Sequence, residues 1–218
     1  MMKYNTIIWD MDGTLLDTLR DLSDAVNHTL RLYGLPLREK EEVRRLLGNG
    51  VRNLMRGAVP GGEKNPRFDD ILADFKAYYT AHIDVHTRPY PGIQELLRQL
   101  HQKGVQMAVA SNKFQEGTDY LINKFFPEIP FVAVLGNRPG FPLKPHPEIV
   151  EEVLHRAKVT RTEAIMTGDS PTDMKTAANG GIDRIAVSWG YRPMKGIPGL
   201  RVAESAEQIL DLFSLITS

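Results

Sequence analysis

The sequence predicts an α/β fold, a doubly wound parallel sheet with an all-helical segment inserted after the first strand. Three observations lead to this prediction. Short apolar runs alternate with helical patterns along most of the chain, which is typical of strands buried between helices. The stretch from residue 17 to about residue 88 shows helical periodicity only. The segment after it, residues 87–91, contains prolines that favour an extended connection back to the sheet.

Each expected element has its own local signals. The strand-like runs are residues 4–10, 105–111, 131–136, 164–169 and 184–189. The helical patterns that alternate with them are residues 92–103, 147–158, 172–179 and 206–216. Prolines 91, 147 and 171 stand where a first helical turn tolerates a missing N–H. In the inserted segment, Leu19, Leu22, Val26 and Leu30 recur at helical spacing, and glycine-containing turns separate the helices.

Composition and charge exclude several classes of function. The 218 residues include 27 Lys plus Arg and 27 Asp plus Glu, so no net basic charge points to nucleic acid. The absence of cysteine excludes disulfides, zinc sites built on cysteine and thiol catalysis. No apolar run has the length of a membrane span or a secretory leader. We therefore expect a cytoplasmic protein whose partners include neither nucleic acid nor a membrane.

The loop after the first strand carries the strongest chemical signal. It reads Asp10-Met11-Asp12-Gly13-Thr14, and ligands of open parallel sheets bind where strands end. Two carboxylates separated by one residue can share a small site, one as nucleophile or metal ligand and one to handle a proton. Gly13 permits a sharp turn, and the Thr14 hydroxyl can orient a carboxylate. The competing interpretation is a turn rich in helix-capping residues.

Three further motifs follow later strands. Ser111-Asn112-Lys113 ends the second run, Lys144 precedes the helical pattern at 147, and Gly168-Asp169 begins a motif that ends at Asp173. Each has a structural alternative, namely a common turn, a solvated lysine and acidic residues at a helix start. Ser111 and Asn112 would lie in the same crevice as Asp10.

These four motifs, in this order, resemble those of the haloacid dehalogenase-like superfamily of phosphohydrolases. Shorter strings resemble its phosphoglycolate phosphatase branch, namely 48–50, 89–92 and Trp189-Gly190-Tyr191. The resemblance implies a Rossmann-like core of residues 1–16 and 88–218 and a helical cap of residues 17–87. The dehalogenase members lack the second aspartate, so Asp12 counts against dehalogenation.

The resemblance also implies a reaction, the Mg²⁺-dependent hydrolysis of a small phosphorylated metabolite through an aspartyl-phosphate. Asp10 would attack phosphorus, and Asp12 would protonate the leaving alcohol and later deprotonate water. Lys144 would hold the phosphate and the nucleophile together. Phosphate oxygens would bind Thr14, Ser111, Asn112 and Lys144. The metal would bind Asp10, Asp12 through its backbone carbonyl, and Asp169, an all-oxygen set that suits Mg²⁺. Asp173 would orient Lys144 or the metal's waters.

The substrate remains open at this stage. Phosphoglycolate is the best single candidate, and Asn49, Arg52 and Lys113 are candidates for selectivity because a glycine turn and cations could receive a carboxylate. Equally, Arg52 could belong to a solvated helix face. The alternatives are a sugar-phosphate mutase of the β-phosphoglucomutase type, which keeps the same motifs, and a phosphate sensor with poor turnover. The sequence contains no signal for the oligomeric state.

Overall fold

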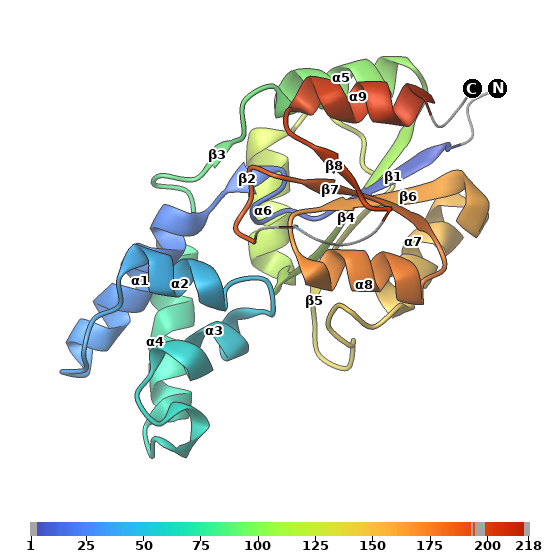
Figure 1. The fold of residues 1–218 in the computed structure, drawn as a ribbon. Helices are drawn as coiled ribbons and strands as arrows, with labels where there is room; N and C mark the ends of the chain where they lie inside the picture. Colours follow the sequence, from blue (N-terminus) through green and yellow to red (C-terminus); the bar gives the residue numbers. More distant parts are fainter. Residues whose placement is uncertain (1–3, 193, 195–198, 216–218) are drawn as a thin grey trace.

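The computed structural model describes residues 4–192, 194 and 199–215 and confirms the α/β fold (Figure 1). Its main sheet has the strand order β5-β4-β1-β6-β7-β8, and every neighbouring pair is parallel. The strands are β1 (Thr6–Trp9), β4 (Gln106–Phe114), β5 (Ala133–Asn137), β6 (Ala164–Gly168), β7 (Asp183–Val187) and β8 (Arg201–Ala203).

Helices cover both faces of this sheet. The helices of the sheet domain are α5 (Ile93–Gln102), α6 (Gln115–Phe125), α7 (Glu148–Ala157), α8 (Pro171–Asn179) and α9 (Ala206–Leu215), with the 3-10 turn η2 (Arg161–Glu163) before β6. Alternate residues of β1 point to opposite faces: Ile7 packs in the core shared with α5, α6 and α9, and Ile8 packs in the core under α7 and α8. A central strand buried on both faces explains why its sequence is continuously apolar.

The inserted segment forms a separate layer of helices beside one end of the sheet (Figure 1). Its elements are α1 (Leu19–Leu32), α2 (Lys40–Leu46), α3 (Val51–Ala58), the 3-10 turn η1 (Gly62–Lys64) and α4 (Phe68–Ala81). The periodic apolar residues of α1 and α4 face each other and are buried, including Leu22, Val26, Phe75 and Tyr79. We call this layer, residues 17–87, the cap.

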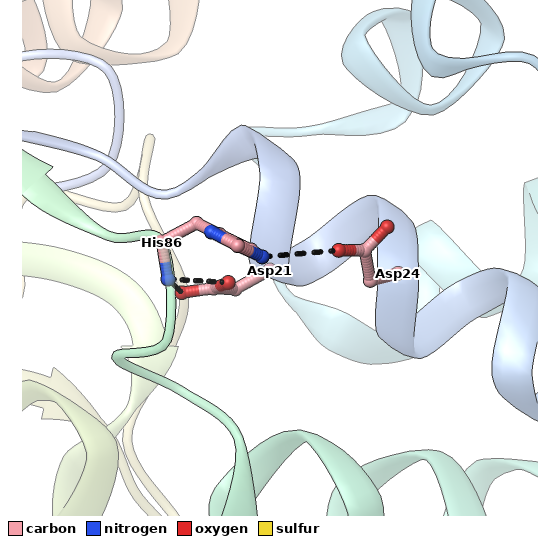
Figure 2. A group of neighbouring side chains, drawn as sticks. All are labelled: Asp21, Asp24 and His86. Carbon is pink, nitrogen blue, oxygen red and sulfur yellow. Dashed lines mark hydrogen bonds and ion pairs between the residues drawn. The ribbon is translucent and has the colours of Figure 1, made fainter.

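Two chain crossings connect the cap to the sheet domain. β2 (Leu16–Asp17) and β3 (Arg88–Pro89) pair as a short antiparallel ladder at this crossing. Just inside the cap, the buried Asp21 carboxylate accepts the backbone N–H groups of His86 and Thr87 and the Thr87 hydroxyl, all within 3.0 Å. Figure 2 shows Asp21 and Asp24 of α1 facing His86, whose ring lies 3.9 Å from the Asp24 carboxylate. The two crossings are thereby tied together and are expected to move as one unit.

Some elements were not expected from the sequence. α6 follows β4 without a loop, and its first turn contains Gly117 and Thr118, which are weak helix formers. β8 is a three-residue strand at the edge of the sheet with two exposed side chains, so it lacks an apolar pattern. Residue 216, the last of the helix expected at 206–216, lies outside the described residues. The same holds for the outer ends of the expected core, residues 1–3 and 216–218. Within the described part of the chain, no helix has the length and apolar character needed to span a membrane.

Candidate active site

The four motifs meet at the carboxyl edge of the sheet. β1 lies between β4 and β6, so Asp10 after β1, Ser111 near the end of β4 and Asp169 after β6 come together. The chain passes from β1 to β4 and β5 on one side and returns to β6 on the other, which makes this edge a topological switch point. Lys144 enters from the loop between β5 and α7, where its peptide bond to Pro145 is cis.

The buried Lys144 ammonium joins the first motif to the last. Its Nζ donates to Asp10 Oδ1 at 2.7 Å, to Asp173 Oδ1 at 2.6 Å and to the Ala110 carbonyl at 2.8 Å. All three of its protons are therefore engaged. Burial works against the charge, but Asp10 and Asp173 outweigh it and hold the pKa of Lys144 above its usual value. This geometry places the expected nucleophile and the expected phosphate-binding lysine in direct contact.

The cluster around Lys144 has more negative than positive charge. Carboxylate oxygens of Asp10, Asp169 and Asp173 lie within 4.8 Å of one another, and all three residues are buried. Burial and the neighbouring Asp173 charge raise the pKa of Asp10 to about 7 despite Lys144, and burial together with Asp10 raises that of Asp169. Three buried carboxylates beside one lysine form a site whose negative charge a further cation would balance. The donor set consists of oxygens only, so it fits a hard divalent cation such as Mg²⁺.

Asp173 is held by the start of helix α8. Its Oδ2 accepts the Ser170 backbone N–H at 3.0 Å and the Ser170 hydroxyl at 2.6 Å, in a capping box that begins the helix at Pro171. Its other oxygen is the one that accepts Lys144. The capping interpretation and the functional interpretation of Asp173 therefore both describe real contacts, one for each oxygen.

The Asp12 side chain lies beside the cluster and contacts both the cap and the sheet domain. Its Oδ1 accepts the hydroxyl of Thr18 at 2.7 Å, and its Oδ2 lies 3.2 Å from Lys113 Nζ. Thr18 stands at the crossing into the cap, and Lys113 at the end of β4. The proposed proton donor is thus fixed by one residue of each module.

The side chains expected to bind phosphate differ in their hydrogen-bond partners and in whether they line the cavity. Ser111 lines a cavity beside Asp10, and its Oγ accepts the Lys113 backbone N–H at 3.1 Å. The Asn112 side chain is engaged elsewhere: it pairs with the backbone N–H and carbonyl of Lys144 and donates to the Gly48 carbonyl. The buried Thr14 hydroxyl has no hydrogen-bond partner among the described residues, so it does not orient a carboxylate here. Ser111 and Asn112 both line the cavity, and the Ser111 hydroxyl still has its proton to donate there.

The loop that follows β7 supports the Asp169 carboxylate. The backbone N–H of Tyr191 donates to Asp169 Oδ2. A Cβ on Gly190 would lie 2.1 Å from Asp169 Cβ, and one on Gly13 would lie 2.4 Å from Asp169 Oδ2. Glycine at both positions is required for the two loops to close around this carboxylate.

The cavity beside Asp10 and Asp12 is small and has an apolar roof. It provides about 40 Å³ for water-sized groups, room for about three waters. Its floor is polar, and its roof comes from the cap, namely Leu22, Leu47, Val51 and Leu54 with Gly48 and Gly50.

Reciprocal bonds hold the cap in place. Arg44 of the cap donates to the Tyr191 carbonyl, and Arg192 of the sheet domain donates to the Leu47 carbonyl. The structure therefore represents a closed arrangement.

The three selectivity candidates are separated by the fold. Lys113 lines the cavity and is 3% exposed. Arg52 lies on the outside of α3, where its guanidinium pairs with Glu63 at 2.9 Å and Asp69 at 3.1 Å. Asn49 accepts the Thr172 hydroxyl at 3.2 Å, which makes it a contact between cap and core. These acidic partners within the cap are what the alternative of a solvated helix face predicts for Arg52.

Two tyrosines that the sequence analysis did not single out also belong to the site. The Tyr191 hydroxyl accepts the Thr18 backbone N–H at 2.7 Å, beside the Thr18 contact to Asp12. Its only sequence signal was its place in the Trp189-Gly190-Tyr191 string. Tyr79 of α4 accepts a hydrogen bond from Lys113 at 2.6 Å. Because Tyr79 shares the periodic apolar face of α4 with Phe75, the sequence alone indicated an ordinary core position.

Comparison with known proteins agrees with this geometry. Residues 7–187 match the model of the haloacid dehalogenase-like hydrolase family. A phosphoglycolate phosphatase of Mesorhizobium japonicum is 33% identical over 193 residues, which cover 87% of this chain and 85% of that protein.

Solved structures share the fold over the whole chain. A protein of Lactobacillus delbrueckii subsp. bulgaricus, provisionally described as a phosphoglycolate phosphatase, superposes with a TM-score of 0.90 at 32% identity and full coverage of both chains. CbbY from Rhodobacter sphaeroides, solved in complex with phosphate, has a TM-score of 0.81 at 23% identity and covers 96% of each chain, which is a likeness of fold alone.

Proposed function

We propose a function from one premise: this chain belongs to the haloacid dehalogenase-like hydrolase family. It is a phosphatase, a phosphoric monoester hydrolase like the relatives it matches over most of its length. We further propose that it depends on Mg²⁺ and that its substrate is a small phosphorylated carboxylic acid, with 2-phosphoglycolate the first candidate. The observation that carries the chemistry is the buried contact of Lys144 with both Asp10 and Asp173.

The reaction follows from the positions of two aspartates. An Asp10 oxygen attacks phosphorus, a phosphorus–oxygen bond forms, and the bond to the leaving alcohol breaks as Asp12 gives that oxygen a proton. Water then attacks the same phosphorus, Asp12 takes its proton, and the bond to Asp10 breaks to release inorganic phosphate. Both aspartates end in their starting state. Asp12 lies at the cavity beside Asp10, as this division of roles requires.

The carboxylate cluster suits a metal cofactor. Asp10 and Asp169 are the proposed carboxylate ligands, with the Asp12 backbone carbonyl as a third, because Asp173 is engaged by Lys144 and Ser170. When bound there, a divalent cation supplies positive charge beside the phosphoryl oxygens. Lys144 supplies a second, permanent charge, since its neighbours keep it protonated.

The charge of the cavity favours a substrate that carries a second anionic group besides the phosphate. Among the residues that the structure describes, Lys113 is the one cation that lines this cavity, and its ammonium has three donors. Two of them face Tyr79 and Asp12, and within the described residues the third has no partner. A carboxylate two bonds from the phosphate oxygen is a matching acceptor.

Phosphate release from a matched pair of substrates tests the proposal. 2-Phosphoglycolate and 2-hydroxyethyl phosphate have nearly the same size and differ in that a hydroxymethyl group replaces the carboxylate. p-Nitrophenyl phosphate and glucose 6-phosphate extend the comparison. We expect the highest kcat/KM for 2-phosphoglycolate in Mg²⁺. Equal kcat/KM for the matched pair would refute the carboxylate assignment, and a preference for the hexose phosphate would refute the small-substrate assignment.

A variant of Lys113 tests the residue that carries the preference. Lys113→Met keeps the aliphatic stem and removes the charge, so we expect kcat/KM to fall by at least about tenfold more for 2-phosphoglycolate than for 2-hydroxyethyl phosphate. Lys76→Met, at an exposed position of α4, is the matched control and should change neither value. An equal loss on both substrates would mean that Lys113 acts through Asp12 alone.

A further inference from the structure

A buried hydroxyl group of the cap reaches into the sheet domain at Lys113. Tyr79 of α4 is fully buried, and its hydroxyl accepts a hydrogen bond from Lys113 Nζ at 2.6 Å. The same ammonium lies 4.6 Å from the centre of the Tyr79 ring. Tyr79 therefore contacts the charge through both its oxygen and its π face.

The environment of Tyr79 gives its hydroxyl no packing role. The ring packs against Phe75 at 5.7 Å and Phe114 at 6.2 Å, so phenylalanine would fill the same space. A buried hydroxyl destabilises a core unless it is hydrogen-bonded, and Lys113 is its partner. Burial raises the pKa of Tyr79 well above its usual value, so the phenol is neutral and accepts from the ammonium.

The direction of the Lys113 ammonium depends on such anchors. A lysine head is a compact charge on a flexible four-carbon stem, and its contacts decide where its protons point. Asp12 lies 3.2 Å away on one side and Tyr79 on the other, which leaves the remaining proton for the cavity. Asp12 belongs to the sheet domain, as Lys113 does. Tyr79 belongs to the cap, so this anchor exists only when the cap is closed.

We infer that Tyr79 is a positioning residue for substrate selectivity: on cap closure it fixes the Lys113 ammonium in the orientation that receives the substrate's carboxylate. This inference rests on the proposed function, because it requires Lys113 to bind that carboxylate. The preference for a substrate with a carboxylate then depends on a pair of residues, Tyr79 of the cap and Lys113 of the sheet domain. Selection then occurs with closure, and an open site binds phosphate esters without regard to a carboxylate.

The test is Tyr79→Phe, which removes one oxygen and keeps the ring. We expect the KM for 2-phosphoglycolate to rise about tenfold, with kcat for 2-phosphoglycolate and both constants for 2-hydroxyethyl phosphate within about twofold of wild type. Tyr78→Phe is the matched control, since that ring stacks between His28 and His82 and does not contact Lys113. It should leave all four constants unchanged. Melting temperatures of both variants verify that they are folded.

A double variant separates positioning from a general effect on the core. If Tyr79 acts through Lys113, adding Tyr79→Phe to Lys113→Met should cause no further loss of preference for 2-phosphoglycolate. Additive losses, or an equal change on the two substrates in Tyr79→Phe alone, would overturn the inference.

The two proposals fail in different ways. If Lys113→Met loses the preference and Tyr79→Phe retains it, the inference is wrong and the proposed substrate class stands. If Lys113→Met also retains it, the assignment of the preference to Lys113 and the inference about Tyr79 are both wrong, and the substrate class is decided by the matched pair of substrates in the wild type.

Discussion

Replacing Asp10 by asparagine should abolish turnover and at the same time stabilise the metal-free protein. The reason is that Asp10 is buried beside two further carboxylates with one lysine to balance them. Asparagine has the same shape, still accepts the Lys144 proton through its Oδ1 and carries no charge. It therefore removes the repulsion and the desolvation of the carboxylate without leaving a cavity.

The size of the effect follows from the pKa of Asp10. Its folded-state value is about 7, against 3.8 for the free side chain, a difference of about three units. At about 1.4 kcal/mol per unit, the ionised carboxylate opposes folding by up to about 4 kcal/mol. This difference already includes the attraction to Lys144. Because the buried amide of asparagine keeps part of the desolvation cost, we expect a net gain of about 1–4 kcal/mol at pH 8 in metal-free buffer. For a domain of this size, that corresponds to a rise in Tm of about 3 °C per kcal/mol.

The pH dependence has a definite sign. Because the folded-state pKa is raised, the folded protein binds the Asp10 proton more tightly than the unfolded chain does. The stability of the metal-free wild type should therefore fall as pH rises from about 4 to about 7, and this contribution should be constant above that. In Asp10→Asn this contribution is absent, so the difference between the two proteins should vanish near pH 4.

Thermal unfolding in EDTA at pH 4.5, 6 and 8 provides the measurement. The predicted Tm difference between Asp10→Asn and wild type is smallest at the lowest pH and largest at the highest. Excess Mg²⁺ should narrow it at pH 8, because a cation that binds the folded wild type stabilises it by mass action. A variant equal to or less stable than wild type at pH 8 in EDTA would refute the electrostatic description of the cluster.

Two further predictions concern the same reaction. Asp12→Asn should lower kcat by about 10²–10⁴-fold with little change in Tm, and a loss below about threefold in steady-state phosphate release would indicate that Asp12 positions the metal and does not transfer protons. Removing metal with EDTA should stop phosphate release and added Mg²⁺ should restore it, because the Asp10 and Asp169 carboxylates are buried together; full activity in metal-free buffer would contradict a metal-dependent reaction.

Most of the sheet and the catalytic edge could be predicted from the chain itself. Buried parallel strands are continuous apolar runs, and the residue that follows each run lies at one edge of the sheet. Asp10, Ser111 and Asp169 are expected to lie together on this ground alone. It succeeded because each signal is local and because strand order follows few topological rules. It was weakest for α6 and β8, whose sequences are poor in the expected local patterns.

The sequence does not predict the role of a residue that has several possible partners in the folded chain. Arg52 follows a glycine turn, as a substrate-binding cation could, yet Glu63 and Asp69 bind it on the outer face of the cap. Asn112 stands in a phosphate-binding motif, yet its side chain holds the Lys144 backbone. In both cases the competing partner is distant in the sequence or on another turn of the chain, so only the packed structure decides which contact forms.

Local periodicity and motif spacing were therefore sufficient for the fold class and the carboxylate loop, and the resemblance to a known family added the expected role of Lys144. The docking of the cap, which joins Tyr79 to Lys113 and Thr18 to Asp12, required the tertiary structure. The physical reason is that a hydrophobic pattern specifies which face of a helix is buried, but not which polar group that face meets. Apolar burial is non-directional, whereas a hydrogen bond between a buried phenol and a buried ammonium depends on distances that only the assembled modules define.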